Sequence, residues 1–269
     1  MKSKLFNSIT LIAIIILVSC KPILLNAQKV KKNDMNNSAP QDLETIEVLE
    51  LRNYLLKPDM ADTFRNYFHS KFVSPMTELG GHTLGEFKIN EVNDRFVWFR
   101  GFTDMKTRVR FLNDFYIDSP TWKEYGKGAN EMIINSDNVY LLKPLHKTAT
   151  LKTDKAVTVI DFYICNSTIK KVIELFDTYY IPFLKTINIE DISIWVSEMT
   201  ENDFPRLPVF QDKNLLVTIT NFQDIEEYEA KQKAINNIPN ALKKAMQELI
   251  TTQNKWVLLN QNKEHYDKQ

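Results

Sequence analysis

The sequence repeats itself, and this internal repeat limits the fold more than any other feature does. The apolar run VLELRNYLL (48–56) corresponds to VTVIDFYIC (157–165) about a hundred residues later. Further along each copy, Phe-Thr-Asp (102–104) corresponds to Phe-Gln-Asp (222–224) at the end of another apolar run. A self-similarity of this length predicts that one structural unit occurs twice in the chain.

Strand-like and helix-like stretches alternate within each copy in the order β-α-β-β-α-β. This order is the split βαβ arrangement of a ferredoxin-like unit. Helices cover one side of such a sheet, and the bare side must be buried against another layer. We therefore expect an α+β fold in which tandem ferredoxin-like repeats, 44–147 and 155–262, form a pseudo-dimeric α+β barrel with its helices outside.

The N-terminal segment differs from the rest of the chain. Its apolar run, 9–18, is too short to span a bilayer and ends in Leu-Val-Ser before Cys20, which resembles the bacterial lipobox. We predict a lipoprotein signal peptide over 1–20, lipidation of Cys20 and a flexible polar tether over 21–43. Ordinary cleavage after Ala27 is the alternative. Both predict export, and lipidation predicts an anchor to a membrane of the bacterial cell envelope.

Charge and cysteine content exclude several classes of partner. The 34 basic residues balance 34 acidic ones, which does not favour nucleic acid. Lys106, Arg108 and Arg110 fall early in a predicted helix, and we interpret them as a solvated face rather than a nucleic-acid patch. Only Cys165 remains if Cys20 carries lipid, and the four histidines lack metal-ligand spacing, so neither a metal nor a cofactor is expected.

Strand alternation gathers charged and aromatic side chains on one face of the first-repeat sheet. We expect the purely apolar faces to pack on the helices and these mixed faces to point between the two sheets. Guanidinium groups pair with oxygens and stack on rings, so this face could bind a small hydrophobic or anionic ligand. The candidates for the ligand pocket are Glu50, Arg52, Tyr54, Trp98, Arg100 and Phe102.

The second repeat lacks most of this set, which favours a site in the first repeat. The same charges could instead form a buried ion-pair network that holds the sheets in register, and both readings stay open. The expected replacements are Asp161 and Tyr163 at the positions of Glu50 and Arg52, and Thr218 and Thr220 at those of Trp98 and Arg100.

Four segments of the first repeat resemble the NIPSNAP family: ELRNYLLKPDM, GGHTLGEF, DRFVWFRGFTDMKTRVRFLNDFY and TWKEY. The resemblance is close over Val48 to Leu145 and weaker, through the fold-level repeat only, over Ala156 to Asn260. It implies a fold of the dimeric α/β-barrel superfamily. That superfamily also contains cofactor-independent monooxygenases, which use a barrel pocket with few fixed residues.

The superfamily also contains haem-degrading enzymes, and the sequence disfavours that branch. Asn53 matches their strand asparagine, but Phe102 stands where they have a tryptophan, and no histidine lies between His82 and His146. Two hypotheses remain. The chain is an exported, lipid-anchored ligand-binding protein, or it is a cofactor-independent monooxygenase of a quinol-like or phenolic substrate. A homo-oligomer is left open.

Overall fold

A computed structural model describes residues 45–146, 151, 153–166 and 169–261. The predicted signal peptide with Cys20 and the predicted tether lie outside these residues. None of the helices within the described ranges is long and apolar enough to cross a membrane.

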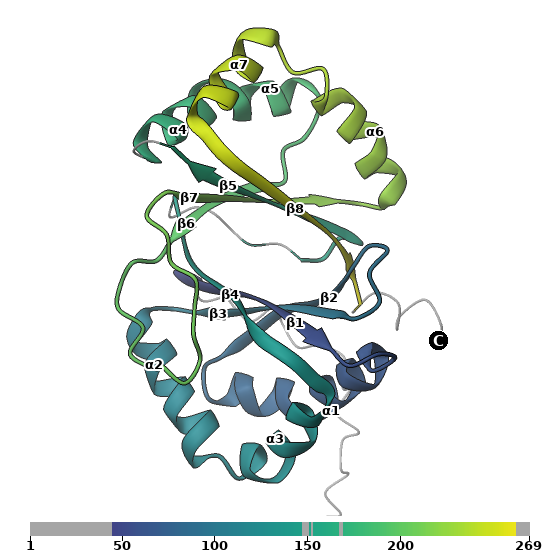
Figure 1. Cartoon of the computed structure of the whole chain (residues 1–269), viewed down its shortest axis with the longest axis vertical. Coiled ribbons are helices and arrows are strands. Elements are labelled where there is room, and N and C mark those ends of the chain that lie inside the picture. The colour runs from purple at the N-terminus through teal and green to yellow at the C-terminus, as the bar shows by residue number, and fades with distance from the viewer. Residues whose placement is uncertain (1–44, 147–150, 152, 167–168, 262–269) are drawn as a thin grey trace, which may run out of the picture. The chain divides into compact units, whose positions relative to one another are not determined.

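The first repeat has the order of elements that the sequence predicts (Figure 1). Its last strand begins at Ile133, directly after the preceding helix. The elements are β1 (Val48–Leu56), α1 (Ala61–Glu78), β2 (His82–Ile89), β3 (Arg95–Phe102), α2 (Met105–Asn113), the π-helical turn η1 (Asp114–Asp118), α3 (Pro120–Met132) and β4 (Ile133–Pro144).

The second repeat follows the same order, again with a π-helical turn, here between its first two helices. Its elements are β5 (Val157–Cys165), α4 (Ile169–Leu175), the π-helical turn η2 (Phe176–Tyr180), α5 (Ile181–Thr186), β6 (Ile192–Ser197), β7 (Leu215–Phe222), α6 (Ile225–Ile235), α7 (Asn240–Leu249) and β8 (Ile250–Asn260).

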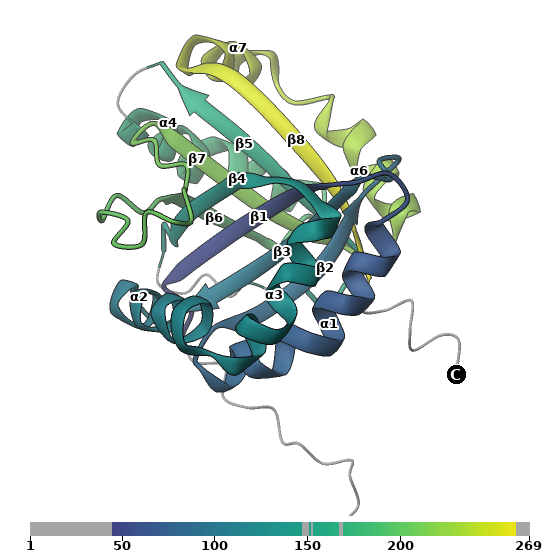
Figure 2. The ribbon, with the colours of Figure 1, turned by 60° about the horizontal axis from the view of Figure 1, so that its bottom comes forward.

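All the strands join into a closed antiparallel barrel in the order β1-β3-β2-β8-β5-β7-β6-β4. The two halves meet where Phe87 of β2 pairs with Asn260 of β8, and where Leu142 of β4 pairs with Ser197 of β6. The helices of the first repeat cover the outer face of one half, and those of the second repeat cover the other (Figures 1 and 2). The predicted α+β barrel of tandem ferredoxin-like repeats is confirmed.

The repeated Phe-x-Asp motif marks equivalent junctions between a strand and a helix. The side chain of Asp104 accepts a hydrogen bond from the backbone N–H of Thr107 at 2.6 Å and caps α2. Asp224 accepts one from the N–H of Glu227 at 2.7 Å and caps α6 in the same way. An aspartate at this position satisfies a backbone donor that the helix itself leaves unpaired.

Apolar side chains from both repeats fill the barrel interior. Leu51 and Phe99 of the first repeat lie in one buried cluster with Phe162 and Val217 of the second, and no described helix contributes to it. A closed barrel of this strand number has an interior just wide enough for side chains to fill. The interior is therefore an apolar core shared by the two repeats.

The mixed faces lie instead between the sheet and the helices. Tyr54 and Trp98 belong to a core cluster with Phe68 of α1 and Phe111 of α2. The prediction that these faces point between the two sheets is therefore wrong. Buried charges require polar partners, and the helices supply them whereas the apolar interior cannot.

Candidate functional site

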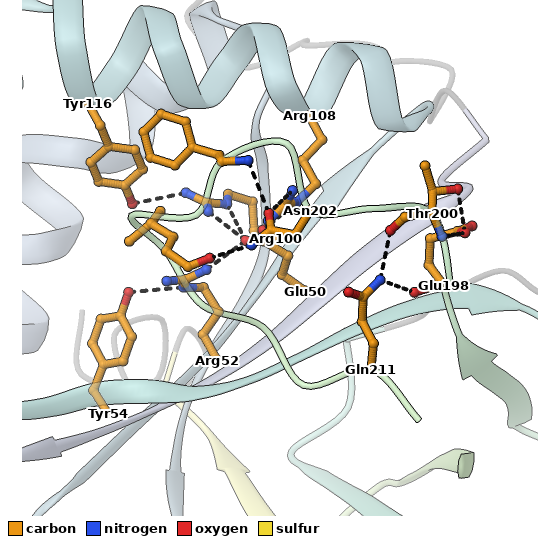
Figure 3. Close-up of polar contacts among 12 residues, drawn as sticks. Glu50, Arg52, Tyr54, Arg100, Arg108, Tyr116, Glu198, Thr200, Asn202 and Gln211 are labelled. Carbon is orange, nitrogen blue, oxygen red and sulfur yellow. Dashed lines mark hydrogen bonds and ion pairs between the residues drawn. The ribbon is translucent and has the colours of Figure 1, made fainter. Parts of the chain in front are cut away.

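Four charged side chains form a buried cluster beneath α2, called here the arginine cluster (Figure 3). Glu50 accepts hydrogen bonds from Arg52 Nη1 at 2.9 Å, Arg100 Nε at 2.9 Å and Arg108 Nε at 2.7 Å. All four side chains are at most 1% exposed. Among the described residues Glu50 is the carboxylate paired with all three arginines, so the cluster carries two positive charges in excess.

Strand pairing and helix docking bring these groups together. Glu50 of β1 lies opposite Arg100 of β3 in the register, and Arg52 follows on the same face of β1. Arg108 reaches Glu50 from α2 above the sheet. Burial alone raises the pKa of Glu50, but the charges of Arg100, Arg108 and Arg52 outweigh burial and hold that pKa well below its ordinary value.

Two tyrosine hydroxyls lie against the outer guanidinium groups. Arg52 Nε donates to Tyr54 Oη at 3.0 Å, and Arg100 Nη1 donates to Tyr116 Oη at 3.1 Å. Each tyrosine oxygen accepts from an arginine, so its own proton is left to be donated elsewhere. Burial raises the pKa of Tyr54 despite the neighbouring Arg52, which keeps this hydroxyl protonated at neutral pH.

A cavity of about 320 Å³ lies between the first-repeat sheet and its helices, and both tyrosines line it. Trp98 lines it as well, and its indole N–H has no hydrogen-bond partner among the described residues. None of the described residues in this lining carries a carboxylate. The lining residues are Tyr54, Phe64, Phe68, Phe72, Met76, Trp98, Phe115, Tyr116, Trp122, Ala129, Asn130, Ile133, Ser136, Phe204, Arg206 and Leu207.

No family model and no curated protein sequence matches the chain. Among solved structures, a candidate monooxygenase from Fusobacterium nucleatum is 11% identical, covers 80% of this chain and 93% of its own, and has a TM-score of 0.53. A candidate monooxygenase from Lactobacillus acidophilus is also 11% identical, covers 80% of this chain and 94% of its own, and has a TM-score of 0.51.

This chain has the dimeric α/β-barrel fold. Both of these matches extend over the two repeats, and at this identity the likeness concerns the fold. Solved structures of NIPSNAP proteins are also similar, each over about one repeat. An uncharacterized NIPSNAP-like domain protein from Burkholderia xenovorans is 21% identical, covers 40% of this chain and 92% of its own, and has a TM-score of 0.35.

The pocket candidates from the sequence do lie together, but in different roles. Tyr54 and Trp98 line the cavity, whereas Glu50, Arg52 and Arg100 form the arginine cluster behind the tyrosines. Phe102 is fully buried and packs on Phe111, with ring centroids 5.4 Å apart. The ion-pair network is therefore present, and two of the candidates line a cavity, while ligand binding there stays a prediction.

Arg108 was misjudged from the sequence. Its expected place on a solvated face is wrong, because the side chain is fully buried on Glu50. Phe111 and Phe115 follow it three and seven residues later and are also buried. This helical spacing would have placed Arg108 on the buried face.

Tyr116 and Asn202 were not identified from the sequence. Tyr116 lies in η1, where the wider π-helical turn changes the helical periodicity. Asn202 Oδ1 accepts a hydrogen bond from Arg108 Nη1 at 3.0 Å, although it lies in the long loop between β6 and β7 of the second repeat. Neither position carries a periodic signal that would connect it to the first-repeat strands.

Strand pairing also corrects how the repeats correspond. Val48 of β1 pairs with Phe102, as Val157 of β5 pairs with Phe222. By this register, the second-repeat residues equivalent to those of β1 lie two residues away from the predicted ones. The observed equivalences are Asp161 with Arg52, Tyr163 with Tyr54, Thr218 with Trp98, and Thr220 with Arg100.

The equivalent layer of the second repeat holds a cavity of about 400 Å³ with different chemistry. Asp161 lines it, and burial raises the pKa of this carboxyl although Lys255 lies 3.5 Å away. Tyr163 and Tyr180 line it too, and burial raises the pKa of Tyr180 to about 12. Of these two cavities, the first-repeat cavity therefore has no carboxylate among the described residues of its lining.

Proposed function

We propose that the first-repeat cavity binds a planar, largely apolar small molecule that carries an oxygen acceptor, such as a quinone, an aromatic ketone or a phenolate. The observation that carries this proposal is the set of hydrogen-bond donors on its wall. Tyr54 and Tyr116 each have a proton to donate, and the Trp98 N–H has no partner among the described residues. Buried donors favour a ligand that supplies the missing acceptor.

The shape and charge of the cavity support the same class of ligand. Its volume lies at the lower end of that of small-molecule sites, and most of its wall is aromatic. The excess positive charge of the arginine cluster lies directly behind Tyr54 and Tyr116. In a buried environment this charge favours a ligand oxygen that is negatively polarised or ionised over a cationic group.

The proposal is tested by calorimetric binding of a matched pair of probes, hydroxymethyl anthraquinone and hydroxymethyl anthracene. We expect the quinone to bind more tightly, and Tyr54→Phe and Tyr116→Phe each to weaken it by roughly threefold to tenfold, the effect of one hydrogen bond. Binding of the anthracene should be unchanged in both variants. Equal affinity for the two probes, or no effect of either variant, would contradict the proposal.

A second candidate function is cofactor-independent oxygenation of a phenolic or quinol-like substrate. The arginine cluster is the observation that favours it, since its charge would stabilise a substrate phenolate, which is the form that gives electrons to oxygen. In such a reaction a ring methylene and O₂ would yield a carbonyl and water. The two candidate monooxygenases that share the fold are consistent with this alternative.

Oxygen uptake separates the two functions. An oxygenase would consume one O₂ for each carbonyl formed from an anthracenone added to the protein, and Tyr54→Phe would slow this turnover. Tight binding of the substrate without oxygen uptake above the rate in buffer would leave ligand binding as the function.

We also propose that the mature protein is exported and held at a membrane by lipid on Cys20. The lipobox-like end of the apolar run supports this. Mass spectrometry of the mature N-terminus decides the point: a diacylated Cys20 is expected. An unmodified N-terminus at Gln28 would exclude the anchor and leave ordinary secretion.

A further inference from the structure

The loop between β6 and β7 of the second repeat, residues 198–214, extends over the cavity of the first repeat. Three of its residues, Phe204, Arg206 and Leu207, belong to the cavity lining. Phe204 is 6% exposed, and its ring lies 6.2 Å from that of Tyr116. The first-repeat cavity is therefore incomplete without the second repeat.

Hydrogen bonds fix this loop at both ends of its course (Figure 3). Gln211 Nε2 donates to the backbone oxygens of Glu198 and Thr200, which joins the outgoing and returning parts of the loop. Asn202 accepts from Arg108 Nη1 and donates from Nδ2 to the backbone oxygen of Leu207 at 3.0 Å. Asn202 thus connects the arginine cluster to the turn that carries the cavity-lining residues.

Arg206 is the charged residue among the described residues that line the cavity, and it is exposed. Arg206 forms no ion pair or hydrogen bond with any residue in the described part of the chain. An arginine that borders an aromatic cavity and has no carboxylate partner among the described residues is complementary to an anionic substituent of a ligand.

We infer that Arg206 makes the site selective for acidic aromatic ligands. The ligand oxygen would lie at the wall formed by Tyr54, Tyr116 and Trp98, and a separate carboxylate or sulfonate would pair with Arg206 at the loop. This inference rests on the proposed function and narrows its ligand class. It assigns the second repeat a role as well, because its loop supplies the residue that recognises the acid.

The test compares anthraquinone carboxylate with anthraquinone carboxamide, which have nearly the same shape but differ in charge. The full chain should prefer the carboxylate by a factor on the order of five, as is typical of a partly exposed ion pair. Arg206→Gln should abolish this preference by weakening the carboxylate alone, and Arg206→Lys should restore part of it. Lys213→Gln is the matched control, since Lys213 is exposed in the same loop but outside the cavity lining.

The outcomes distinguish this inference from the proposed function. One outcome is that Tyr54→Phe weakens binding of the carboxamide while the wild type binds the carboxylate and the carboxamide equally. The selectivity of Arg206 is then refuted and the proposed function stands. If Lys213→Gln reduces the preference as much as Arg206→Gln does, the effect is one of general charge and the inference fails. If neither probe binds, both the inference and the proposed function fall.

Discussion

Glu50 is the residue that makes the buried charges of the first repeat tolerable. Its two carboxylate oxygens serve three guanidinium groups, and the rings of Trp98 and Phe111 lie 5.1 Å and 4.8 Å from the guanidinium of Arg100. Such rings exclude water and interact favourably with the cation. The cluster is therefore shielded from solvent, and Glu50 supplies the one negative charge that partly offsets its three guanidinium groups among the described residues.

Replacing Glu50 with Gln should be severely destabilising. Three buried guanidinium groups would lose their counter-charge, which costs about 3–5 kcal/mol of the free energy of unfolding when a buried pair is broken. Urea denaturation followed by circular dichroism measures this. The control is Glu131→Gln, because Glu131 forms an exposed pair with Lys127 at 3.8 Å and should cost less than about 0.5 kcal/mol. Similar losses in both variants would contradict the role of the cluster.

Glu50 also predicts how stability depends on pH. Its pKa in the folded protein lies below the ordinary value near 4.5, so the ionised carboxylate stabilises the fold above that pH. This contribution is lost as the pH falls from about 4.5 towards the folded-state pKa. The difference in free energy of unfolding between the wild type and Glu50→Gln should therefore narrow between about pH 6 and about pH 3. A difference that stays constant with pH would show that Glu50 is not held ionised.

At the level of elements, the strands and their alternation could be read from the sequence, but the direction of each face could not. Both faces of β1 are buried, including the one that carries Glu50 and Arg52, and every residue of this strand except Leu55 is buried. Alternation separates the faces without saying which one meets the helices. The predicted correspondence between β1 and β5 was wrong by two residues for a related reason. A shift of two residues keeps every side chain on the same face of the strand, so alternation cannot detect it.

The helix starts were the more predictable elements, because the capping aspartates are local signals. Asp104→Ala and Asp224→Ala should each cost about 1 kcal/mol of the free energy of unfolding, since each removes the side-chain acceptor at the start of a helix. Chemical denaturation of the two variants checks this, and the double variant should show the sum of the two losses. No loss in either variant would mean that these aspartates do not cap α2 and α6.

On the scale of the whole molecule, the two repeats share one interior and the second repeat completes the site of the first. The family-like segments of the first repeat indicated the barrel, but no local pattern indicated that loop 198–214 would reach Arg108 and the cavity. Contacts of this kind join residues far apart in sequence and follow from closure of the barrel. They explain why the sequence pointed to the first repeat for a candidate site but missed Asn202 and Arg206.

The shared interior predicts that the repeats unfold together. Phe162→Ala changes a buried second-repeat residue that packs among first-repeat residues, and should cost about 3–5 kcal/mol. Two parent proteins are made, each keeping one tryptophan in one repeat and carrying phenylalanine in place of the others. The fluorescence transitions of the two parents should coincide, and they should still coincide after Phe162→Ala is added to both. Two separate transitions, with only the second-repeat reporter shifted, would refute the shared core.

The central claim is that a ligand binds between the first-repeat sheet and its helices, with its oxygen held by tyrosines that the arginine cluster supports. A crystal structure of the full chain with anthraquinone carboxylate tests this most directly. The account predicts the ring system beside Trp98, a carbonyl oxygen within roughly 3 Å of the hydroxyl of Tyr54 or Tyr116, and the carboxylate at Arg206. A ligand bound in the barrel interior, or in the second-repeat cavity beside Asp161, would contradict it.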